Sequence, residues 1–333
     1  MYVGAILKIK HSLNRSLLIS KDGWEEIKIP ISSGFKSEKW RRAQDKRPIL
    51  LLQGLHASGK PIIFAELVKD NCGTFDRLIP MLRQDRGYLA IDFPGHGLSS
   101  NFPLGMSYYW IDYTITVRRI VQYFKWPKVS ILGHSVGGAS GYYYDVIFPN
   151  EVDFLISIDA LKPITADISV DSLGQRIDNL IKYDHLLSLH REGPAYTMEE
   201  LKKVLHEGSD KSIDLDVCEF ILKRNVKESS TSPSKYYFTR DLRLKELPLL
   251  NIQHDQIIKN TSKLICPTLY FQSSNKIKKF VRLTNTEEIV GILQETKKNF
   301  ERHVVEGTHH VHLNNPERLA GYINDFLVKY DVQ

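Results

Sequence analysis

Apolar runs and amphipathic stretches alternate along most of this chain. Short continuous apolar runs, which are typical of buried parallel strands, occur at 48–54, 88–93, 129–132, 152–158 and 266–272. Between them lie stretches with apolar residues at helical spacing, namely 107–124, 137–148 and 286–298, and a shorter helix over 75–82 that Thr74 would cap. Strands that alternate with helices at this pitch predict an α/β fold, with a mostly parallel sheet covered by helices on both faces.

Two segments depart from this alternation and set the predicted domain organisation. Residues 161–264 are rich in amphipathic helical stretches and have no comparable strand run, so we interpret them as an inserted helical cap. The cap divides a core made of residues 25–160 and 265–333. Residues 1–24 form an N-terminal extension that is basic and free of acids over its first 21 positions. This extension is either a weak mitochondrial presequence or a leading strand or unstructured tail.

Composition narrows the classes of function. The chain has 333 residues and a formal net charge of +6 that is scattered along it, which disfavours a nucleic-acid partner. Its three cysteines lie far apart and fit neither a disulfide framework nor a zinc site. No apolar run in the sequence approaches a membrane span, so we expect no integral membrane association. We expect an intracellular protein, first of all cytoplasmic, with the mitochondrion and the peroxisome as open alternatives and the oligomeric state unknown.

The main chemical motif is KVSILGHSVGG, residues 128–138. Gly133, Ser135 and Gly137 make G-x-S-x-G between a predicted strand and a predicted helix. A turn this sharp leaves no room for a side chain two positions before or after the turn residue, so the glycines are a steric requirement. The turn lifts the Ser135 hydroxyl clear of the sheet and directs the first helical N–H groups beside it. The pentapeptide is frequent by chance, but this presentation suits a nucleophile.

A serine nucleophile needs a base, and histidine serves best because it can take up and return a proton at neutral pH. Three histidines occur in GTHHVH, residues 307–312, between the last predicted strand and the final helix. That position lies at the same carboxyl edge of the sheet as Ser135. His134 adjoins a glycine turn and is assigned a structural role. The three histidines lack a carboxylate or cysteine partner at zinc-like spacing, so we expect no metal site and no cofactor.

Several motifs, in this order, resemble those of the α/β-hydrolase superfamily. They are TFDRLIPML, DFPGHGLSS, GHSVGG, and GTHHVH followed by Pro316. The stretches DNCGTFDRLIP, AIDFPGHGLSS and SILGHSVGG, with YYFTRDLRLK at 236–245, are more narrowly similar to the serine hydrolase-like proteins of that superfamily. The resemblance spans residues 25–330 and implies the α/β-hydrolase fold with an inserted helical cap.

The resemblance also implies roles for individual residues. In the family pattern G-x-H-x-x-H the first histidine is usually the base, which corresponds to His309. His312 would then pack or donate hydrogen bonds, and His310 is the nearest rival for the base. The oxyanion hole would use the backbone N–H of Val136 and that of Leu55, in the loop after the third strand.

This loop departs from the family pattern in two ways. The family usually has His-Gly after the strand, whereas this chain has Gln53 and Gly54. Reading from LQGLH directly to DNCGTFDRLIP restores the expected spacing, so residues 57–69 resemble an insertion. The insertion is a genuine lid element, an alternative-splice product or a gene-model error. Sequencing of transcripts distinguishes these, because a transcript that joins His56 to Asp70 would remove it.

The acid of the triad has two expected places. Many relatives carry it after the strand that follows the cap, but residues 271–280, FQSSNKIKKF, contain no carboxylate. Dehalogenase-like relatives carry it after the strand that follows the nucleophile helix, where IDALKP supplies Asp159. We predict that Asp159 orients His309 and stabilises its imidazolium. An aspartate at this strand end also often caps the turn, and Asp255 is a more distant candidate.

These residues predict a serine hydrolase, foremost a carboxylic-ester hydrolase, that forms an acyl-enzyme on Ser135 with a small-molecule acyl or ester substrate. The chemistry of dehalogenases and epoxide hydrolases is disfavoured, because Ser135 cannot form their alkyl-enzyme ester. The alternative is a hydrolase-fold protein that has lost catalysis and binds a ligand or a partner. Gln53, the insertion and the absence of an acid in its commonest place favour this alternative.

Overall fold

The structure is a computed structural model of the 333-residue chain. It describes residues 25–31, 34–41, 47–54, 70–165, 170–246, 248–249, 252–275 and 286–331. The predicted N-terminal extension, Leu55 and the candidate insertion 57–69 lie outside the described residues.

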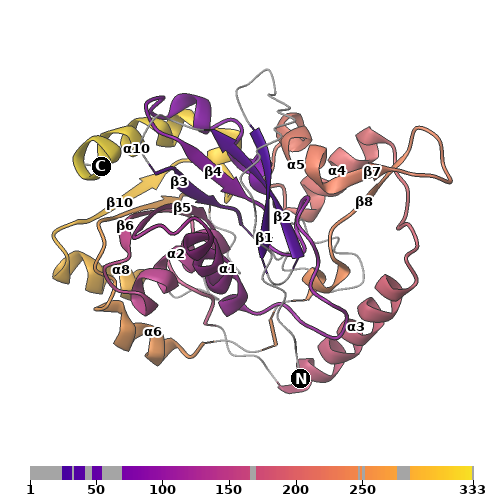
Figure 1. Ribbon diagram of the computed structural model, residues 1–333, viewed down its shortest axis with the longest axis horizontal. Helices are drawn as coiled ribbons and strands as arrows, with labels where there is room; N and C mark the ends of the chain where they lie inside the picture. The colour runs from indigo at the N-terminus through magenta and orange to yellow at the C-terminus, as the bar shows by residue number, and fades with distance from the viewer. Residues whose placement is uncertain are drawn as a thin grey trace, which may run out of the picture.

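An eight-stranded sheet runs through the centre of the molecule, in the order β1-β2-β4-β3-β5-β6-β9-β10 (Figure 1). The strands are β1 Glu25–Ile31, β2 Gly34–Arg41, β3 Ile49–Leu52, β4 Tyr88–Ile91, β5 Val129–His134, β6 Val152–Ile158, β9 Thr268–Ser273 and β10 Phe300–Val305. β1 pairs antiparallel with β2, and β2 antiparallel with β4. The six strands from β4 to β10 pair in parallel. The predicted mostly parallel sheet is confirmed.

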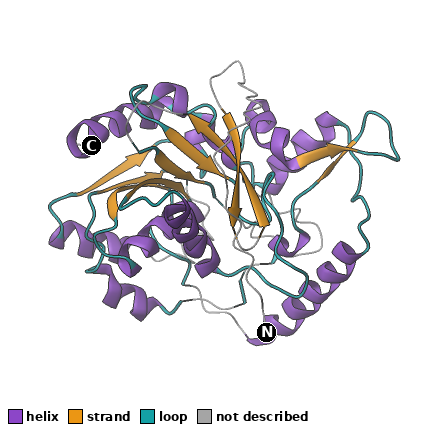
Figure 2. Ribbon diagram, in the orientation of Figure 1, coloured by secondary structure: helices purple, strands orange, loops and turns teal. Residues whose placement is uncertain are grey.

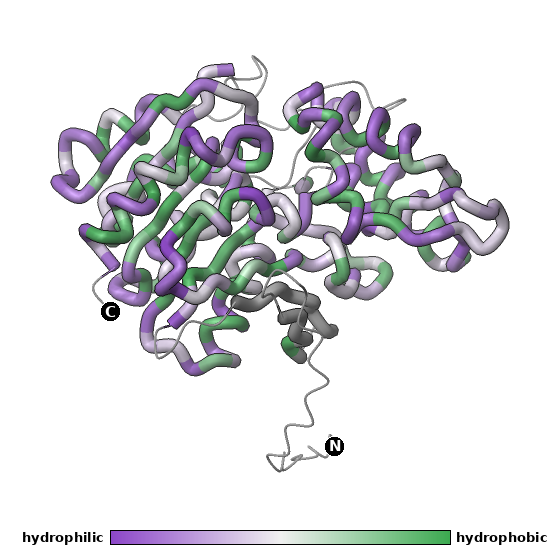
Figure 3. The backbone as a smooth tube through the Cα atoms, turned by 90° about the horizontal axis from the view of Figure 1, so that it is seen from above, coloured by the Kyte–Doolittle hydropathy of each residue, from purple (hydrophilic) through white to green (hydrophobic). Residues whose placement is uncertain are grey.

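Helices cover both faces of this sheet, which explains why its central strands are continuously apolar. Leu50 and Leu52 of β3 face one core, and Ile49 and Leu51 face the other. The first core lies under α1 Trp110–Tyr123, α2 Val136–Ile147, α6 His254–Thr261 and α8 Thr286–Thr296. The second lies under α10 Glu317–Tyr330, the short α9 Val311–Asn314 and two 3-10 turns, η1 Cys72–Phe75 and η2 Ile79–Met81. Figure 3 shows the hydrophobic strands enclosed by more polar helices.

The helix predicted over 75–82 with Thr74 as its cap is wrong. The segment forms η1 and η2 instead, and the side chain of Asn71 caps η1 by accepting the N–H of Gly73 at 2.9 Å. Pro80 lacks an N–H and disfavours helix at the residue before it, so the segment breaks into two turns. The Thr74 hydroxyl is directed to the ring of His312, at 2.7 Å from Nε2.

The segment predicted to be a cap contains most of the remaining elements. They are α3 Val170–Ser188, α4 Met198–Gly208, η3 Leu215–Val217, α5 Cys218–Asn225, β7 Val226–Glu228, β8 Tyr236–Phe238 and η4 Leu242–Lys245. Figure 2 shows α3, α4, α5 and the β7–β8 hairpin gathered at one side of the sheet. The hairpin was not predicted. We propose that these elements form the cap, and α6 packs instead against α8 on the core.

A buried ion pair joins this cap to the core. Asp92, directly after β4, accepts hydrogen bonds from Arg224 of α5 at 2.7 Å and from the N–H of Cys72 at 2.8 Å. The side chain of Asn71 donates to the carbonyl of Ile221 at 2.8 Å. Because these groups are buried and hydrogen-bonded to each other, α5 is fixed against η1.

Among the residues described, no helix is long and apolar enough to span a membrane.

Candidate active site

Ser135 occupies a strained corner between β5 and α2. Its φ is 51° and its ψ is −118°, a backbone conformation that a residue with a side chain seldom adopts. A Cβ added to Gly133 would lie 2.3 Å from the carbonyl carbon of Gly137. One added to Gly137 would lie 2.1 Å from the carbonyl oxygen of Leu52. The predicted strand–turn–helix corner and the steric need for its glycines are confirmed.

The backbone beside Ser135 comes from two segments. α2 begins at Val136, so the N–H of Val136 lies in the first helical turn, where N–H groups have no partner within the helix. On the other side lies Gly54, where an added Cβ would come within 3.1 Å of the Ser135 Cβ and 2.5 Å of Nδ1 of His134. Gly54 therefore packs closely against the corner at Ser135, at the point where the chain leads on toward Leu55. The predicted donor Leu55 itself lies outside the described residues.

The structure brings the predicted base and acid together. His309, in the loop between β10 and α9, has Nδ1 2.7 Å from Oδ2 of Asp159. The two side chains are 5% and 8% exposed. A carboxylate can only accept, so Nδ1 of His309 carries the proton and Nε2 is left as the basic nitrogen. The other oxygen of Asp159 accepts the N–H of Ser273 at 2.6 Å, which fixes the carboxylate.

The sheet order explains how Asp159 can stand in for an acid after β9. β6 and β9 are neighbours, and Ile158 at the end of β6 pairs with Phe271. The residue after β6 and the residues after β9 thus reach the same part of the sheet edge. Asp159 takes a left-handed φ of 55°, which turns the chain away after the strand. The rival candidate Asp255 lies in the first turn of α6, and no hydrogen bond to His309 is found for it among the residues described.

The other two histidines of GTHHVH contact neighbouring segments. Nδ1 of His310 lies 2.5 Å from the hydroxyl of Ser212, in the predicted cap. Nε2 of His312 lies 2.7 Å from the hydroxyl of Thr74, and burial lowers the pKa of the His312 imidazole well below its usual value. These contacts suit packing and hydrogen bonding, the role predicted for His312.

A second aspartate–histidine pair lies beside the first. Nδ1 of His134 is 3.2 Å from Oδ2 of Asp70, and Nε2 of His134 is 2.9 Å from the carbonyl oxygen of His309. Both side chains are buried. Burial raises the pKa of the Asp70 carboxyl from 3.8 to about 7, against the effect of hydrogen bonds from Asn71, Thr74 and Gly54. Sequence reasoning gave His134 a structural role and missed Asp70, although Asp70 begins the motif DNCGTFDRLIP.

Among the residues described, Asp70, His134 and His310 could hold a metal ion. One ligand atom of each lies within 4.8 Å of the others, and all three side chains are buried. Zinc ligands lie about 2.1 Å from the ion, so the two ligand atoms that are farthest apart here would have to move closer together to bind one. The hydrogen bonds of His134 to Asp70 and to His309 already explain its position, so the arrangement requires no ion.

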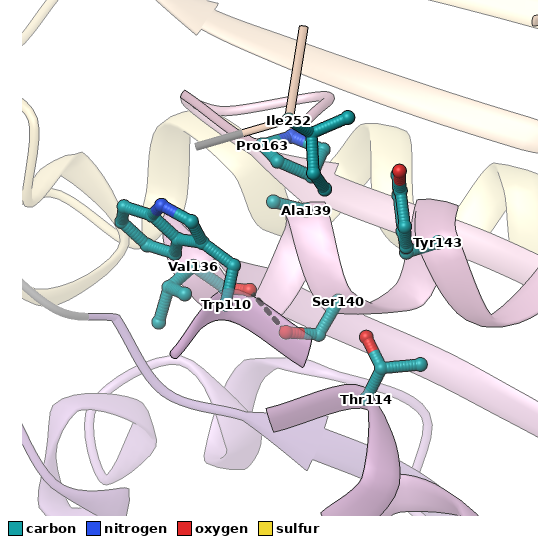
Figure 4. A pocket seen from close by; sticks show the side chains of 8 residues that line it. All are labelled: Trp110, Thr114, Val136, Ala139, Ser140, Tyr143, Pro163 and Ile252. Carbon is teal, nitrogen blue, oxygen red and sulfur yellow. Dashed lines mark hydrogen bonds between the residues drawn. The ribbon is translucent and has the colours of Figure 1, made fainter. Parts of the chain in front are cut away.

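An apolar pocket opens beside the corner, between α1 and α2 (Figure 4). Its lining residues are Trp110, Thr114, Val136, Ala139, Ser140, Tyr143, Pro163 and Ile252. Val136, Ala139, Ser140 and Tyr143 share one face of α2, at the i, i+3, i+4 and i+7 spacing of a helix. The pocket starts one residue from Ser135, and its polar hydroxyl at Ser140 is bonded to the Val136 carbonyl at 2.6 Å. The pocket is small, with a volume of about 10 Å³, close to the space that one water molecule needs.

Known proteins agree with this fold. A family model described as the alpha/beta hydrolase fold matches residues 47–200. A probable serine hydrolase of Drosophila melanogaster is 34% identical over 93% of this chain and 89% of that protein. A serine hydrolase-like protein of Danio rerio is 32% identical over 81% of this chain and 82% of its own length. A hypothetical protein of Pseudomonas aeruginosa PAO1, with a solved structure, superposes with a TM-score of 0.72 at 23% identity, over 92% of this chain and 99% of that one.

The sheet order, the corner at Ser135 and these relatives define the class as an α/β hydrolase. Within that class the chain belongs to the family of the serine hydrolase-like proteins.

Proposed function

We propose that this protein is a serine hydrolase that cleaves carboxylic esters of small molecules through an acyl-enzyme on Ser135. The observation that carries the proposal is the 2.7 Å bond between His309 Nδ1 and Asp159, with the His309 backbone held by the residue that precedes Ser135. A histidine fixed in this tautomer at the edge that presents a strained serine is the arrangement that nucleophilic catalysis needs.

The reaction proceeds in two halves. Oγ of Ser135 attacks the ester carbonyl while Nε2 of His309 takes the hydroxyl proton, and Asp159 stabilises the resulting imidazolium. The N–H groups of Val136 and Leu55 bind the oxyanion. The imidazolium then gives its proton to the leaving alkoxide, which departs as an alcohol and leaves the acyl group on Ser135. A water molecule then attacks the acyl-enzyme while Nε2 of His309 takes one of its protons, and the imidazolium returns that proton to Oγ of Ser135 as the carboxylic acid leaves.

The apolar pocket is small, with a volume of about 10 Å³, so it would receive only a short apolar group of the substrate. It is lined by Val136, whose N–H would hold the oxyanion, so a group bound there would lie next to the reacting carbonyl. Ala139→Leu would fill the pocket from α2. We expect it to lower kcat/KM for butanoyl esters about tenfold relative to acetyl esters, which corresponds to losing one or two buried methylene groups. An unchanged preference over a series of p-nitrophenyl esters would remove the pocket from the proposal.

A fluorophosphonate probe tests the proposal directly. The folded wild-type protein should gain one probe adduct by intact mass, located on Ser135 by peptide mapping, and Ser135→Ala should gain none. The same variant should lose esterase activity by a factor on the order of 10⁶. Labelling of both proteins alike would place the reactive group elsewhere.

A second candidate function is ligand or partner binding without catalysis. Gln53 stands where the family usually has histidine, and both polar atoms of its buried amide are without a hydrogen-bond partner among the residues described. A buried amide without these hydrogen bonds, at the start of the oxyanion loop, suits the binding of a ligand as well as a reaction. Under this alternative the folded wild-type protein remains unlabelled by the probe.

A further inference from the structure

The second aspartate–histidine pair contacts three segments of the site. His134 directly precedes Ser135, its Nε2 lies 2.9 Å from the carbonyl oxygen of His309, and Asp70 receives the N–H of Gly54 at 3.4 Å. The pair thus lies between the strand of the nucleophile, the loop of the base and the start of the oxyanion loop. None of the steps proposed above uses either side chain.

The bonding of His134 fixes where its protons are. A carbonyl oxygen can only accept, so Nε2 of His134 must donate to His309. Nδ1 then faces Oδ2 of Asp70 with one proton between them, held by the carboxyl group or by the ring. If that proton is lost, a lone pair faces a carboxylate, and the favourable response of the ring is to move its other proton to Nδ1. That tautomer has no hydrogen to donate to the His309 carbonyl.

We propose that Asp70 and His134 are positioning residues of the active site. Through one shared proton they hold His134 in the tautomer that binds the backbone of His309, and so they hold the base in register with Ser135. This inference rests on the serine hydrolase function proposed above. It concerns neither the triad nor the oxyanion donors.

Electrostatics couples Asp70 to the base as well. A positive charge on His309 lowers the pKa of Asp70, against the larger effect of burial that raises it to about 7. By reciprocity, the protonation of His309 depends on whether Asp70 is ionised. The described titratable groups that face Asp70 are His134 at the end of β5, His309 and His310 in the loop before α9, and, through Thr74, His312 of α9.

This coupling has a kinetic signature that a merely structural role would lack. His309 must be neutral to act as the base, and the negative charge that Asp70 gains as pH rises favours the protonated form of His309. The rising limb of kcat/KM is then broader than a one-proton curve, and activity falls again at higher pH, because ionised Asp70 no longer favours the tautomer of His134 that holds His309. Removing the carboxylate should leave a steeper, one-proton limb that lies at lower pH.

The experiment compares Asp70→Asn, Asp70→Ala and wild type by kcat, KM and kcat/KM between pH 5 and 9, with p-nitrophenyl acetate as substrate. The amide of Asp70→Asn can donate to Nδ1 of His134 and keep the tautomer, so activity should stay within about tenfold of wild type, with the narrowed and shifted limb. Asp70→Ala removes the hydrogen-bond partner of Nδ1 of His134 and leaves a cavity beside the ring, so the ring is no longer held against the carbonyl of His309. Its kcat should fall about a hundredfold, as expected for a misplaced base, with KM little changed.

Asp145→Asn is the matched control. Asp145 is also fully buried, its carboxyl pKa is also raised by burial, and it accepts the N–H groups of Ile265 and Cys266 at 2.7 and 3.0 Å, away from the site. Its variant should keep the wild-type limb. The inference is overturned if the limbs of Asp70→Asn and wild type superimpose, or if folded Asp70→Ala retains wild-type kcat. If wild type itself is inactive and unlabelled by the fluorophosphonate, the proposed function fails first.

Discussion

Two aspartate–histidine pairs, Asp159–His309 and Asp70–His134, meet at one edge of the sheet, and they are built differently. In the first the bond is 2.7 Å and the side chains remain 8% and 5% exposed. In the second the bond is 3.2 Å and the side chains are 0% and 1% exposed. Each carboxylate holds Nδ1 of its histidine. The pairs differ at the second ring nitrogen. Nε2 of His134 is bonded to the backbone carbonyl of His309, whereas Nε2 of His309 is the nitrogen proposed to act as the base.

The comparison teaches that a carboxylate–imidazole pair is not by itself a catalytic unit. A base must direct one nitrogen at the substrate, whereas a nitrogen bonded to the backbone is committed to structure. Complete burial adds to this difference, because it favours a neutral Asp70 and raises the pKa of that carboxyl to about 7. We therefore assign proton transfer to Asp159–His309 and positioning to Asp70–His134.

The largest effect is expected from His309→Ala. Without the base, kcat for ester hydrolysis should fall by a factor on the order of 10⁶, because the serine hydroxyl stays protonated. Steady-state kinetics with p-nitrophenyl acetate measures the loss. His310→Asn is the comparison, and it should stay within about tenfold of wild type. A far greater loss in the His310 variant than in the His309 variant would transfer the role of base to His310.

The next effect is that of Asp159→Asn. The amide would donate to Nδ1 of His309 and impose the wrong tautomer, so kcat should fall about 10⁴-fold with little change in KM. Turnover near that of wild type would show that Asp159 only caps the strand end. Asp255→Asn serves as the control and should be without effect.

A smaller effect is expected on the free energy of unfolding, and it tests the protonation of Asp70 separately from catalysis. Its folded pKa, about 7, lies above the value of 3.8 for the free side chain, so the folded state binds the extra proton between those values. This contribution to stability is fully present below pH 3.8 and is lost as pH rises through 7. Its slope approaches about 1.4 kcal/mol per pH unit. Urea unfolding at pH 5, 6 and 7 should show a flatter dependence for Asp70→Asn, and parallel dependences would contradict the shift.

The smallest effect is expected from Thr74→Val. This change removes the hydroxyl between His312 and Asp70 and should cost about 1 kcal/mol in the free energy of unfolding. Activity should stay within threefold of wild type, because the Asp70–His134 bond itself is untouched. A loss of activity as large as that of Asp70→Ala would mean that Thr74, rather than Asp70, holds the pair in place.

Sequence reasoning reached those parts of the fold that depend on local rules. The apolar runs predicted the parallel strands, because strands covered on both faces must be apolar throughout. The G-x-S-x-G spacing predicted the corner at Ser135, because close approach of Gly133 and Gly137 to backbone atoms follows from the turn alone. The helix over 75–82 was mispredicted, because hydrophobic spacing outweighed Pro80 in the interpretation.

The network behind the site was beyond sequence reasoning. Asp70 and His134 are 64 positions apart, and nothing in their local patterns indicates that they share a proton. Asp159 was predicted only through a resemblance, and its selection over other carboxylates depends on β6 lying next to β9, a consequence of sheet order. Contacts of this kind arise from topology, which periodicity does not encode.

The most direct test of the central claim is the rate at which Ser135 reacts with a fluorophosphonate, measured from pH 5 to 9 in wild type, Asp159→Asn and Asp70→Asn. We predict a loss on the order of 10⁴-fold for Asp159→Asn at every pH, and a loss within about tenfold for Asp70→Asn with a steeper limb at lower pH. If instead Asp70→Asn abolishes the reaction and Asp159→Asn leaves it intact, the roles assigned to the two pairs are wrong.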